Sequence, residues 1–227
     1  MLQSIAMKDY PIDMFKDFGL TIIDECHHMS AEVFSNALFK IVTHKMLGLS
    51  ATMTRKDGLS CVFKMFIGPV LIKRKRKENK NVTIYVKRFE TNNEEYNNVE
   101  INYNGRVNHS KMISKISSSE ERTDFIINTI KNMFSEDKHI LILGQYKSLL
   151  VSLYKKLEEQ NFATIGYYIG GMKQADLKAS ENKQIIIATY SMAEEALDIK
   201  TLNTLFMVTP KSDIVQSIGR ILRKKHD

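Results

Sequence analysis

The stretch "TIIDECHHMS", residues 21 to 30, sets an apolar run directly before two adjacent carboxylates, Asp24 and Glu25. A short apolar run that ends in polar residues is typical of a strand buried in a parallel sheet. Ligands of open parallel sheets bind at the carboxyl ends of the strands. The stretch therefore predicts an α/β fold with a polar site at the end of residues 20–24.

Strand and helix patterns alternate on both sides of this stretch. A second apolar run at 44–51 predicts another strand, and Ser30 is suited to cap a helix between the two. Apolar residues recur there at helical spacing: Val33, Phe34, Ala37, Leu38 and Ile41. Alternating strands and helices predict a parallel sheet that is covered on both faces.

The C-terminal half repeats this alternation. Ser118 followed by Glu121 forms a capping-box pattern before a helix with Phe125, Ile126, Ile130 and Phe134. A helix at 148–160 has Leu149, Leu150, Leu153, Tyr154 and Leu157 on one face. Strands are predicted at 139–144, 163–169, 183–190 and 203–210, and a final helix is predicted at 213–224.

The region between the two halves has a different character. Residues 73–81 contain no apolar side chain, and they are followed by apolar alternation at 82–86 and again at 99–103. We interpret this region as a linker with a possible β-ribbon. The predicted organisation is residues 1–75 for part of a first lobe, 76–110 for the linker and 111–227 for a second lobe.

Composition is that of a folded protein, with 43% hydrophobic and 26% charged residues. The net charge of +7, from 33 Lys and Arg against 26 Asp and Glu, favours a polyanionic partner. Neither a membrane-spanning apolar run nor a signal peptide is found in the sequence, so we expect a soluble intracellular protein. Cys26 and Cys61 fit no disulfide framework and are expected to be reduced and buried.

The acid pair admits three interpretations. One carboxylate holds Mg²⁺ through water while its neighbour orients or deprotonates a water molecule, as phosphoryl transfer requires. Alternatively, Asp24 caps the following helix and Glu25 is a solvated loop residue. A third possibility is a zinc site, although adjacent histidines diverge; its ligands would be Asp24, Cys26, His27, His28 and His44.

The predicted final helix gathers polar side chains on one side. Gln216, Gly219, Arg220 and Arg223 are spaced at i, i+3, i+4 and i+7. An arginine delivered to a γ-phosphate accelerates its transfer by about 10³ to 10⁵. The alternative is a solvated basic helix end that favours the helix dipole.

Seven short stretches follow one another along the chain: "LQSI" (2–5), "DECH" (24–27), "SAT" (50–52), "RKDGL" (55–59), "YYIGGMK" (167–173), "ATYSMAEEALDI" (188–199) and "QSIGRILR" (216–223). In content and order they resemble the motifs of superfamily two helicases, and the resemblance extends from residue 2 to residue 223. It is to the DExH branch, which includes XPB-like repair helicases and the poxvirus-type transcript-release helicases of large cytoplasmic DNA viruses.

The resemblance implies two RecA-like parallel-sheet lobes, the first incomplete at its N-terminus, with ATP and Mg²⁺ as cofactors. It implies that Asp24 holds Mg²⁺, that Glu25 activates the attacking water and that His27 senses the nucleotide. Residues implied to couple the nucleotide to strand movement are Ser50, Ala51, Thr52 and Asp198. Those implied to reach the phosphates from the second lobe are Gln216, Arg220 and Arg223.

The partner implied is single-stranded DNA lying across both lobes, or a DNA:RNA hybrid, within transcription or repair machinery. The candidate nucleic-acid-binding residues are Gln3, Ser4, Arg55, Lys56, Gln145, Tyr146, Gly170, Gly171 and Thr189. The expected location is the virion or the cytoplasmic replication site for a viral protein, and the nucleus for a cellular one.

The sequence departs from the family in lacking a phosphate-binding segment of the form GxxxxGK[ST]. We expect that segment upstream of Met1, so that the complete protein is an ATP-dependent DNA helicase and this fragment alone is inactive. The alternative is a non-catalytic nucleic-acid-binding module. Met53 and Ala196 also stand where relatives commonly carry proline and glycine.

Overall fold

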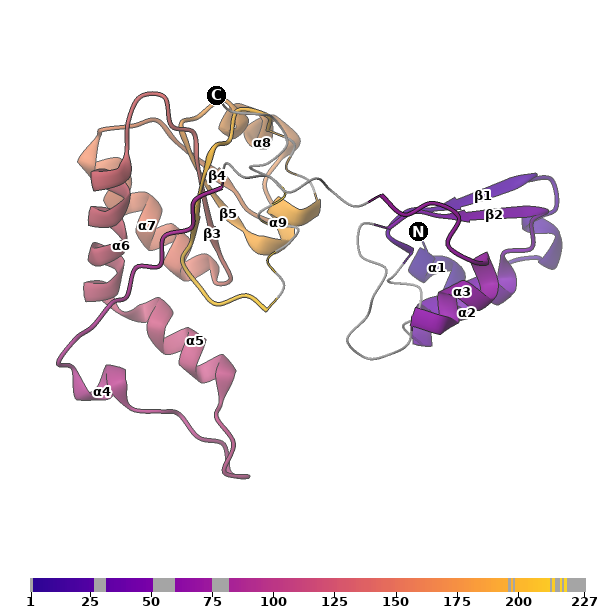
Figure 1. The fold of residues 1–227 in the computed structure, drawn as a ribbon, viewed down its shortest axis with the longest axis horizontal. Coiled ribbons are helices and arrows are strands. Elements are labelled where there is room, and N and C mark those ends of the chain that lie inside the picture. Colours follow the sequence, from indigo (N-terminus) through magenta and orange to yellow (C-terminus); the bar gives the residue numbers. More distant parts are fainter. Residues whose placement is uncertain are drawn as a thin grey trace. The chain divides into compact units, whose positions relative to one another are not determined.

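The chain divides into two compact units, Met1–Thr83 and Ile84–Asp227, in a computed structural model (Figure 1). The structure describes residues 2–26, 32–50, 60–74, 82–195, 197, 199–212, 214, 217 and 219. The boundary between the units falls inside the stretch that the sequence predicts as a linker. Each unit has its own sheet, so each is described separately.

The first unit contains a two-stranded parallel sheet with helices packed on it. Its elements are α1 (Leu2–Met7), the short 3₁₀ helix η1 (Ile12–Phe15), β1 (Leu20–Ile23), α2 (Glu32–Lys40), β2 (Lys45–Gly48) and α3 (Ser60–Ile67). Strands β1 and β2 pair in parallel, with Ile23 opposite Gly48. The predicted order of strand, helix and strand is therefore present.

The core of this unit lies on one side of the sheet. Ile23, Cys26 and Leu38 are buried together, and residues from α1, α3 and β2 pack against them. Gly48 permits this packing, because a Cβ there would lie only 2.9 Å from Cys26 Sγ. On the other face Leu20 and Ile22 are 49% and 58% exposed. Among the described residues, the prediction of a sheet covered on both faces therefore does not hold for β1.

The second unit is built on a four-stranded parallel sheet with strand order β4-β5-β3-β6. Its elements are α4 (Glu94–Asn97), α5 (His109–Ser118), α6 (Glu120–Met133), β3 (Ile140–Gly144), α7 (Lys147–Gln160), β4 (Ile165–Tyr168), α8 (Gln174–Glu181), β5 (Ile185–Thr189), α9 (Tyr190–Glu195) and β6 (Thr204–Met207). All four predicted strands are present, slightly shorter than predicted.

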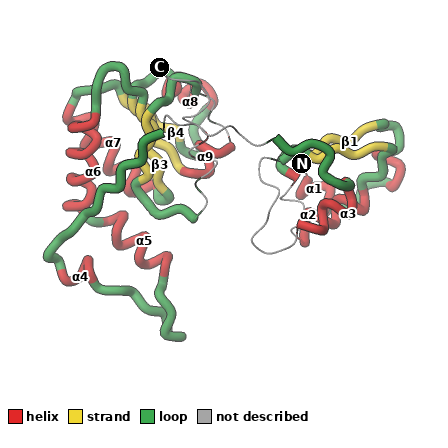
Figure 2. The backbone as a smooth tube through the Cα atoms, viewed as in Figure 1, coloured by secondary structure: helices red, strands yellow, loops and turns green. Residues whose placement is uncertain are grey.

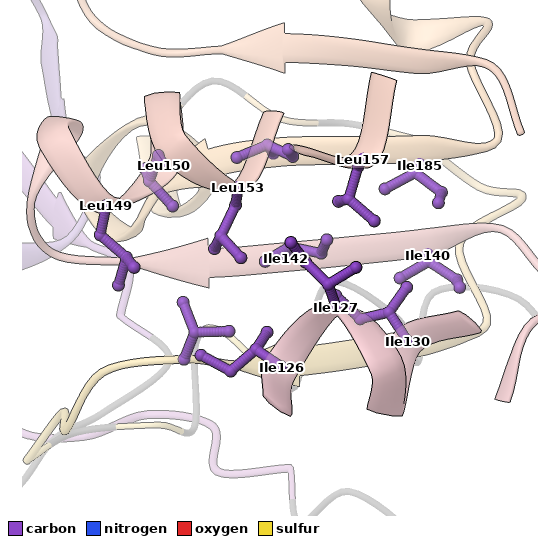
Figure 3. Packing of buried hydrophobic residues seen from close by; sticks show 12 residues of the cluster. Ile126, Ile127, Ile130, Ile140, Ile142, Leu149, Leu150, Leu153, Leu157 and Ile185 are labelled. Carbon is purple, nitrogen blue, oxygen red and sulfur yellow. The ribbon is translucent and has the colours of Figure 1, made fainter. Parts of the chain in front are cut away.

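Both faces of this sheet are covered, as the continuous apolar runs of β3 and β5 predict. On one face, Ile140 and Ile142 of β3 meet apolar side chains of α6 and α7 (Figure 3). On the other face, Leu141 and Leu143 are buried with residues of β5, α8 and α9. Alternate side chains of one strand therefore enter two separate cores.

The helix that begins the second block starts one residue later than the capping-box pattern predicts. Ser118 is the last residue of α5, and its hydroxyl group donates to the backbone oxygen of Lys115 at 3.0 Å. Ser119 is the N-cap of α6 and accepts a hydrogen bond from Arg122 N. The predicted cap is wrong because Ser118 belongs to α5, and the sequence pattern did not reveal that helix.

The predicted ribbon also differs from the structure. Within the described residues, 82–92 form an extended loop that Figure 2 draws without strand. Residue Ile101 instead forms an antiparallel bridge with Val107. The second alternating run therefore pairs locally across a turn, because Gly105 adopts a positive φ of 75° that lets the chain reverse.

The remaining predictions concern single features. Cys26 is buried as expected, whereas Cys61 on α3 is exposed, and both are free thiols. The predicted final helix lies mostly outside the described residues, although Ser217 and Gly219 are helical. Among the described helices, none combines the length and apolar character needed to cross a bilayer.

Candidate functional site

The acid pair forms a tight turn directly after β1. Asp24 Oδ1 accepts a hydrogen bond of 2.9 Å from the backbone N–H of Glu25, and Glu25 adopts a φ of 48°. A positive φ is unfavourable for a residue with a side chain, and such strain is concentrated at functional sites. Asp24 is exposed and Glu25 is half-buried. Two adjacent carboxylates at a strand end form a donor set that suits Mg²⁺.

This turn is joined to the segment that follows β2. Cys26 N donates to Leu49 O at 2.9 Å, and Leu49 N donates to Ile23 O at 2.8 Å. The two bonds continue the pairing of β1 and β2 beyond the ends of both strands. Leu49 is therefore hydrogen-bonded to both residues that flank the acid pair, Ile23 and Cys26. Ser50 is the next residue along the chain.

The carboxylates also affect their buried neighbour Cys26. Burial raises the pKa of the Cys26 thiol, and the nearby charges of Glu25 and Asp24 raise it further. The thiol is therefore kept protonated beside the acid pair, since thiolate would be both desolvated and repelled. Cys26 acts as a small apolar residue in this core.

The structure does not support the helix-cap alternative for the acid pair, and it leaves the zinc alternative untested. Helix α2 begins at Glu32, well beyond Asp24, so Asp24 does not cap it. Within the part of the chain that the structure describes, no three His, Cys, Asp or Glu residues gather as a metal site would require. His27 and His28, which belong to the zinc alternative, lie outside the described residues.

In the second unit the candidates follow the carboxyl ends of neighbouring strands. Gln145 and Tyr146 follow β3, Gly170 and Gly171 come after β4, and Thr189 ends β5. Since these three strands are parallel and adjacent, the five residues lie along one edge of the sheet. We call this set the strand-end edge. The sequence predicted these residues, and the topology brings them together.

The loops of the strand-end edge are tied to one another. Lys147 Nζ donates to Gly170 O at 2.9 Å, which connects the loop after β4 to the start of α7. Thr189 is only 8% exposed, and its hydroxyl group lies 3.4 Å from that of the exposed Ser191. Sequence reasoning missed Lys147 and Ser191, although each is a polar residue within three positions of a strand end, which was a usable signal.

The two glycines of this edge differ in what they require. Gly171 has a φ of 96°, a conformation that favours glycine. At Gly170 no positive φ is needed, and an added Cβ would meet no atom closer than Met192 Sδ at 4.0 Å. The backbone at Gly170 is therefore open enough for a ligand to approach closely.

In the first unit, Gln3 and Ser4 lie on α1. Gln3 is exposed, while Ser4 Oγ lies 3.1 Å from Tyr10 Oη within the same unit. The structure thus gives Ser4 an internal partner in addition to its predicted role. The other candidate residues lie outside the described residues; they are His27, Ala51, Thr52, Arg55, Lys56, Asp198, Gln216, Arg220 and Arg223.

Arg122 is a further residue that the sequence did not single out. Its guanidinium group donates to Val208 O at 2.5 Å and to Ile116 O at 3.2 Å. Burial lowers the pKa of Arg122, while the nearby Tyr96 opposes the shift. Arg122 therefore holds the carboxyl end of β6 against α5.

Two family models match the chain. Residues 1–58 match the DEAD/DEAH box helicase model, and residues 121–225 match the helicase conserved C-terminal domain. Together these matches cover most of the chain, one in each unit. Their order along the chain is that of the motifs quoted above.

Two of the curated relatives illustrate the sequence similarity. A putative ATP-dependent RNA helicase of Acanthamoeba polyphaga mimivirus is 42% identical over 231 residues, which cover 99% of this chain and 44% of the relative. A putative ATP-dependent RNA helicase of African swine fever virus is 24% identical, covering 98% of this chain and 47% of the relative. The chain spans about half the length of the curated relatives it matches.

Solved structures share the fold. The helicase Lhr of Mycobacterium smegmatis, bound to ssDNA and AMP-PNP, matches 98% of this chain and 28% of its own with a TM-score of 0.58 and 12% identity. S. cerevisiae Dbp5, bound to RNA and ADP BeF3, matches 92% of this chain and 51% of its own with a TM-score of 0.53 and 13% identity. The predicted RecA-like parallel-sheet architecture is confirmed.

Proposed function

Because the chain belongs to the helicase family that the DEAD/DEAH box and helicase C-terminal domain models describe, we propose that it forms part of an ATP-dependent helicase or translocase that moves along nucleic acid. The observation that carries the proposal is the hydrogen-bonded link between the acid-pair turn and Leu49, which precedes Ser50. A change at the carboxylates reaches Ser50 through two backbone hydrogen bonds. A hydrogen-bonded connection of this kind can carry coupling between a nucleotide and a nucleic-acid strand.

The proposed chemistry is attack of water on the γ-phosphate of ATP. Asp24 is suited to hold Mg²⁺, which supplies positive charge against the phosphates when bound. Glu25 orients the attacking water and accepts its proton. In the turn, Asp24 Oδ1 accepts from the backbone N–H of Glu25, which itself adopts a φ of 48°; we assign the two separate roles to these adjacent carboxylates.

The strand-end edge is the proposed nucleic-acid track. Gly170 offers an open backbone after β4, and Gln145 is an exposed side chain at the end of β3, on the other side of β5. Contacts of this kind position the phosphate backbone and read no sequence. The net charge of +7 supports such a partner.

The resemblance to XPB-like and transcript-release helicases leads us to propose DNA or a DNA:RNA hybrid as the substrate, acting with transcription or repair machinery inside the cell. The mimivirus and African swine fever virus relatives are named RNA helicases. RNA is therefore the third substrate that a test must include.

The decisive test measures ATP hydrolysis by the protein expressed from its full reading frame, with and without single-stranded DNA, RNA and a DNA:RNA hybrid. We expect stimulation by nucleic acid. Glu25→Gln should lower the turnover by about 10²- to 10⁴-fold, the usual contribution of a general base. Arg220→Ala should lower it by about 10³- to 10⁵-fold, because the γ-phosphate loses its arginine.

A matched control is Glu94→Gln on the exposed helix α4, which should leave the turnover unchanged. Nucleic-acid binding of Glu25→Gln should also stay at the level of the unsubstituted protein. Full ATPase activity in Glu25→Gln would remove the assignment of Glu25. Binding that depends steeply on salt, together with no hydrolysis in the unsubstituted protein, would favour the non-catalytic binding module.

A further inference from the structure

Residues 99–107 form a hairpin that the proposed function does not yet use; we call it the tip hairpin. Ile101 bridges to Val107, and Asn102 N donates to Arg106 O at 2.8 Å. Gly105, with its φ of 75°, closes the turn by donating to Asn102 O at 2.9 Å. The turn therefore has a defined conformation that holds the intervening residues in place.

The tip hairpin is anchored on α5. Asn108 N donates to Glu100 O at 2.8 Å, and the Asn108 side chain donates to Asn102 Oδ1 at 2.7 Å. The same side chain caps α5 by accepting from Lys111 N. Lys115 Nζ, one helical turn further on, lies 3.4 Å from Glu100 Oε1 of the hairpin. A hairpin tied to a helix in this way presents its tip without a large cost for ordering the backbone of the loop on binding.

Tyr103 at the tip has no packing role in the described structure. Its exposed fraction is 105%, the largest among the large apolar side chains of the described chain. An aromatic side chain gains stability by burying its ring, so Tyr103 contributes little to the fold. Both faces of the ring are accessible to a flat ligand.

The charges around the tip favour an anionic partner. Arg106 and Lys111 are both exposed. The only carboxylate within residues 98–112 is that of Glu100, and it lies 3.4 Å from Lys115 Nζ. An exposed aromatic ring near exposed basic side chains is typical of sites that bind single-stranded nucleic acid. Bases stack on the ring, and the phosphates contact the basic side chains.

A contact places the base of the tip hairpin next to the strand-end edge. Tyr146, which follows β3, has its hydroxyl group 3.5 Å from the backbone oxygen of Ser110 at the start of α5. Both residues belong to the second unit. A strand on the strand-end edge therefore passes close to the helix that carries the tip hairpin.

We propose that Tyr103 is a base-stacking residue, which receives a nucleobase of the strand bound along the strand-end edge while Arg106 and Lys111 contact its phosphates. The inference rests on the proposed function, since it needs a bound strand. It adds a contact to the bases, whereas the residues of the strand-end edge are proposed to contact the backbone. Stacking on one ring accepts any base, so it requires no sequence preference.

Fluorescence gives a direct test, because these 227 residues contain no tryptophan. The substitution Tyr103→Trp, made in the protein expressed from its full reading frame, places a fluorescent reporter at the tip. Its signal is the tryptophan fluorescence of the variant minus that of the unsubstituted protein. We expect a short thymidine or uridine oligonucleotide to quench it through stacking. Tyr85→Trp, at a side chain that is 68% exposed in the same unit, is the matched control and should not be quenched.

Affinity gives an independent readout. Tyr103→Ala should weaken oligonucleotide binding by about 5- to 100-fold, and Tyr103→Phe should retain it, since one stacked base contributes that much. Thermal unfolding of each variant checks that the fold is unchanged. Suppose that the unsubstituted protein binds the oligonucleotide. Unquenched fluorescence of Tyr103→Trp, or full affinity of Tyr103→Ala, then overturns the stacking role of Tyr103 and leaves the proposed function intact. If the unsubstituted protein binds no oligonucleotide, the proposed function fails as well.

Discussion

The hydroxyl group of Tyr190 donates a hydrogen bond of 2.6 Å to the backbone oxygen of Thr209, and this bond crosses over β3, which lies between β5 and β6. Thr209 Oγ1 also accepts from Gln145 N at 2.9 Å. Thr209 therefore holds the carboxyl ends of three strands together. Gln145 and Thr189 of the strand-end edge lie at these strand ends. The alignment of Gln145 with Thr189 therefore depends on the two hydrogen bonds of Thr209.

Tyr190→Phe should lower the free energy of unfolding by about 1 to 3 kcal/mol. The substitution keeps the buried ring but takes a donor away from the carbonyl oxygen of Thr209 in a buried environment. Urea unfolding followed by circular dichroism measures the change. Tyr103→Phe removes a hydroxyl group from a fully exposed ring and should stay within about 0.5 kcal/mol of the unsubstituted protein; equal losses in both variants would contradict the role of Tyr190.

Gly166→Ala should destabilise the second unit by about 1 to 3 kcal/mol. An added Cβ would lie 2.8 Å from Ser180 Cβ and 2.9 Å from Ser180 Cα, so β4 and α8 would have to separate. Thermal unfolding measures the loss. An unchanged melting temperature would show that α8 shifts freely, contrary to the packing described above.

Gly170→Ala separates binding from stability, because a Cβ at Gly170 meets only Met192 Sδ at 4.0 Å. The melting temperature should therefore be nearly unchanged. Oligonucleotide affinity should fall by about 10-fold, since the Cβ occupies the space that a phosphate needs. Fluorescence anisotropy at several salt concentrations measures this fall, and unchanged affinity would mean that phosphate does not approach Gly170.

Arg122→Met should lower the free energy of unfolding by about 2 to 4 kcal/mol. Two carbonyl oxygens, those of Val208 and Ile116, lose charged donors, and methionine offers no replacement. Denaturant unfolding measures the change. Arg106→Met on the exposed tip hairpin is the matched control and should have little effect.

The two cysteines should react at different rates with iodoacetamide at pH 8. Burial and the charges of Glu25 and Asp24 raise the pKa of Cys26, so it offers little thiolate, and its side chain is 2% exposed. Cys61 is exposed and should be alkylated at least about 10-fold faster. Peptide mass spectrometry over time separates the two sites. Equal rates would show that the turn holding the acid pair opens readily.

The stability of the second unit should fall between pH 10 and pH 12. Burial, followed by the charges of Tyr154 and Glu158, raises the pKa of Tyr167 from its ordinary value of 10.0 to about 12. The folded state then retains a proton that the unfolded state releases, so stability is complete below pH 10 and is lost as the pH rises towards 12.

Tyr167→Phe tests this pH dependence, because phenylalanine keeps the ring stacked on Tyr154, 4.1 Å between centroids, and removes the ionising group. The variant should lose less stability than the unsubstituted protein over the same pH range. Melting temperatures at pH 8, 10 and 11 give the comparison. Parallel curves for both proteins would assign the alkaline loss to other groups.

Local patterns were sufficient to predict most of the sheet. The runs at 139–144 and 183–190 are continuously apolar because β3 and β5 are covered on both faces. The leucines at 149–157 repeat at helical spacing because α7 packs one side on that sheet. Helix α8 escaped prediction because its sequence is polar and only Leu177 and Ser180 are buried.

Candidate residues that directly follow a strand were equally accessible to prediction. Gln145, Gly170 and Thr189 each stand at a strand end in the sequence, and parallel topology then places such ends on one edge. The contribution of Thr209 escaped prediction, since its partners Gln145 and Tyr190 are 64 and 19 residues away along the chain. Long-range hydrogen bonds leave no periodic signal.

Hydrophobic periodicity and the residues that end each run thus specify the strands, the main helices, the α/β class and the acid pair after β1, because burial acts on each short segment separately. Spatial packing specifies the rest: the left-handed turn at Glu25, the cap at Ser119 and the hairpin that exposes Tyr103. The hydrogen bonds at Glu25 and Ser119 span only one and three residues, but which of the competing local hydrogen bonds forms, and which ring stays uncovered, is set when the elements assemble.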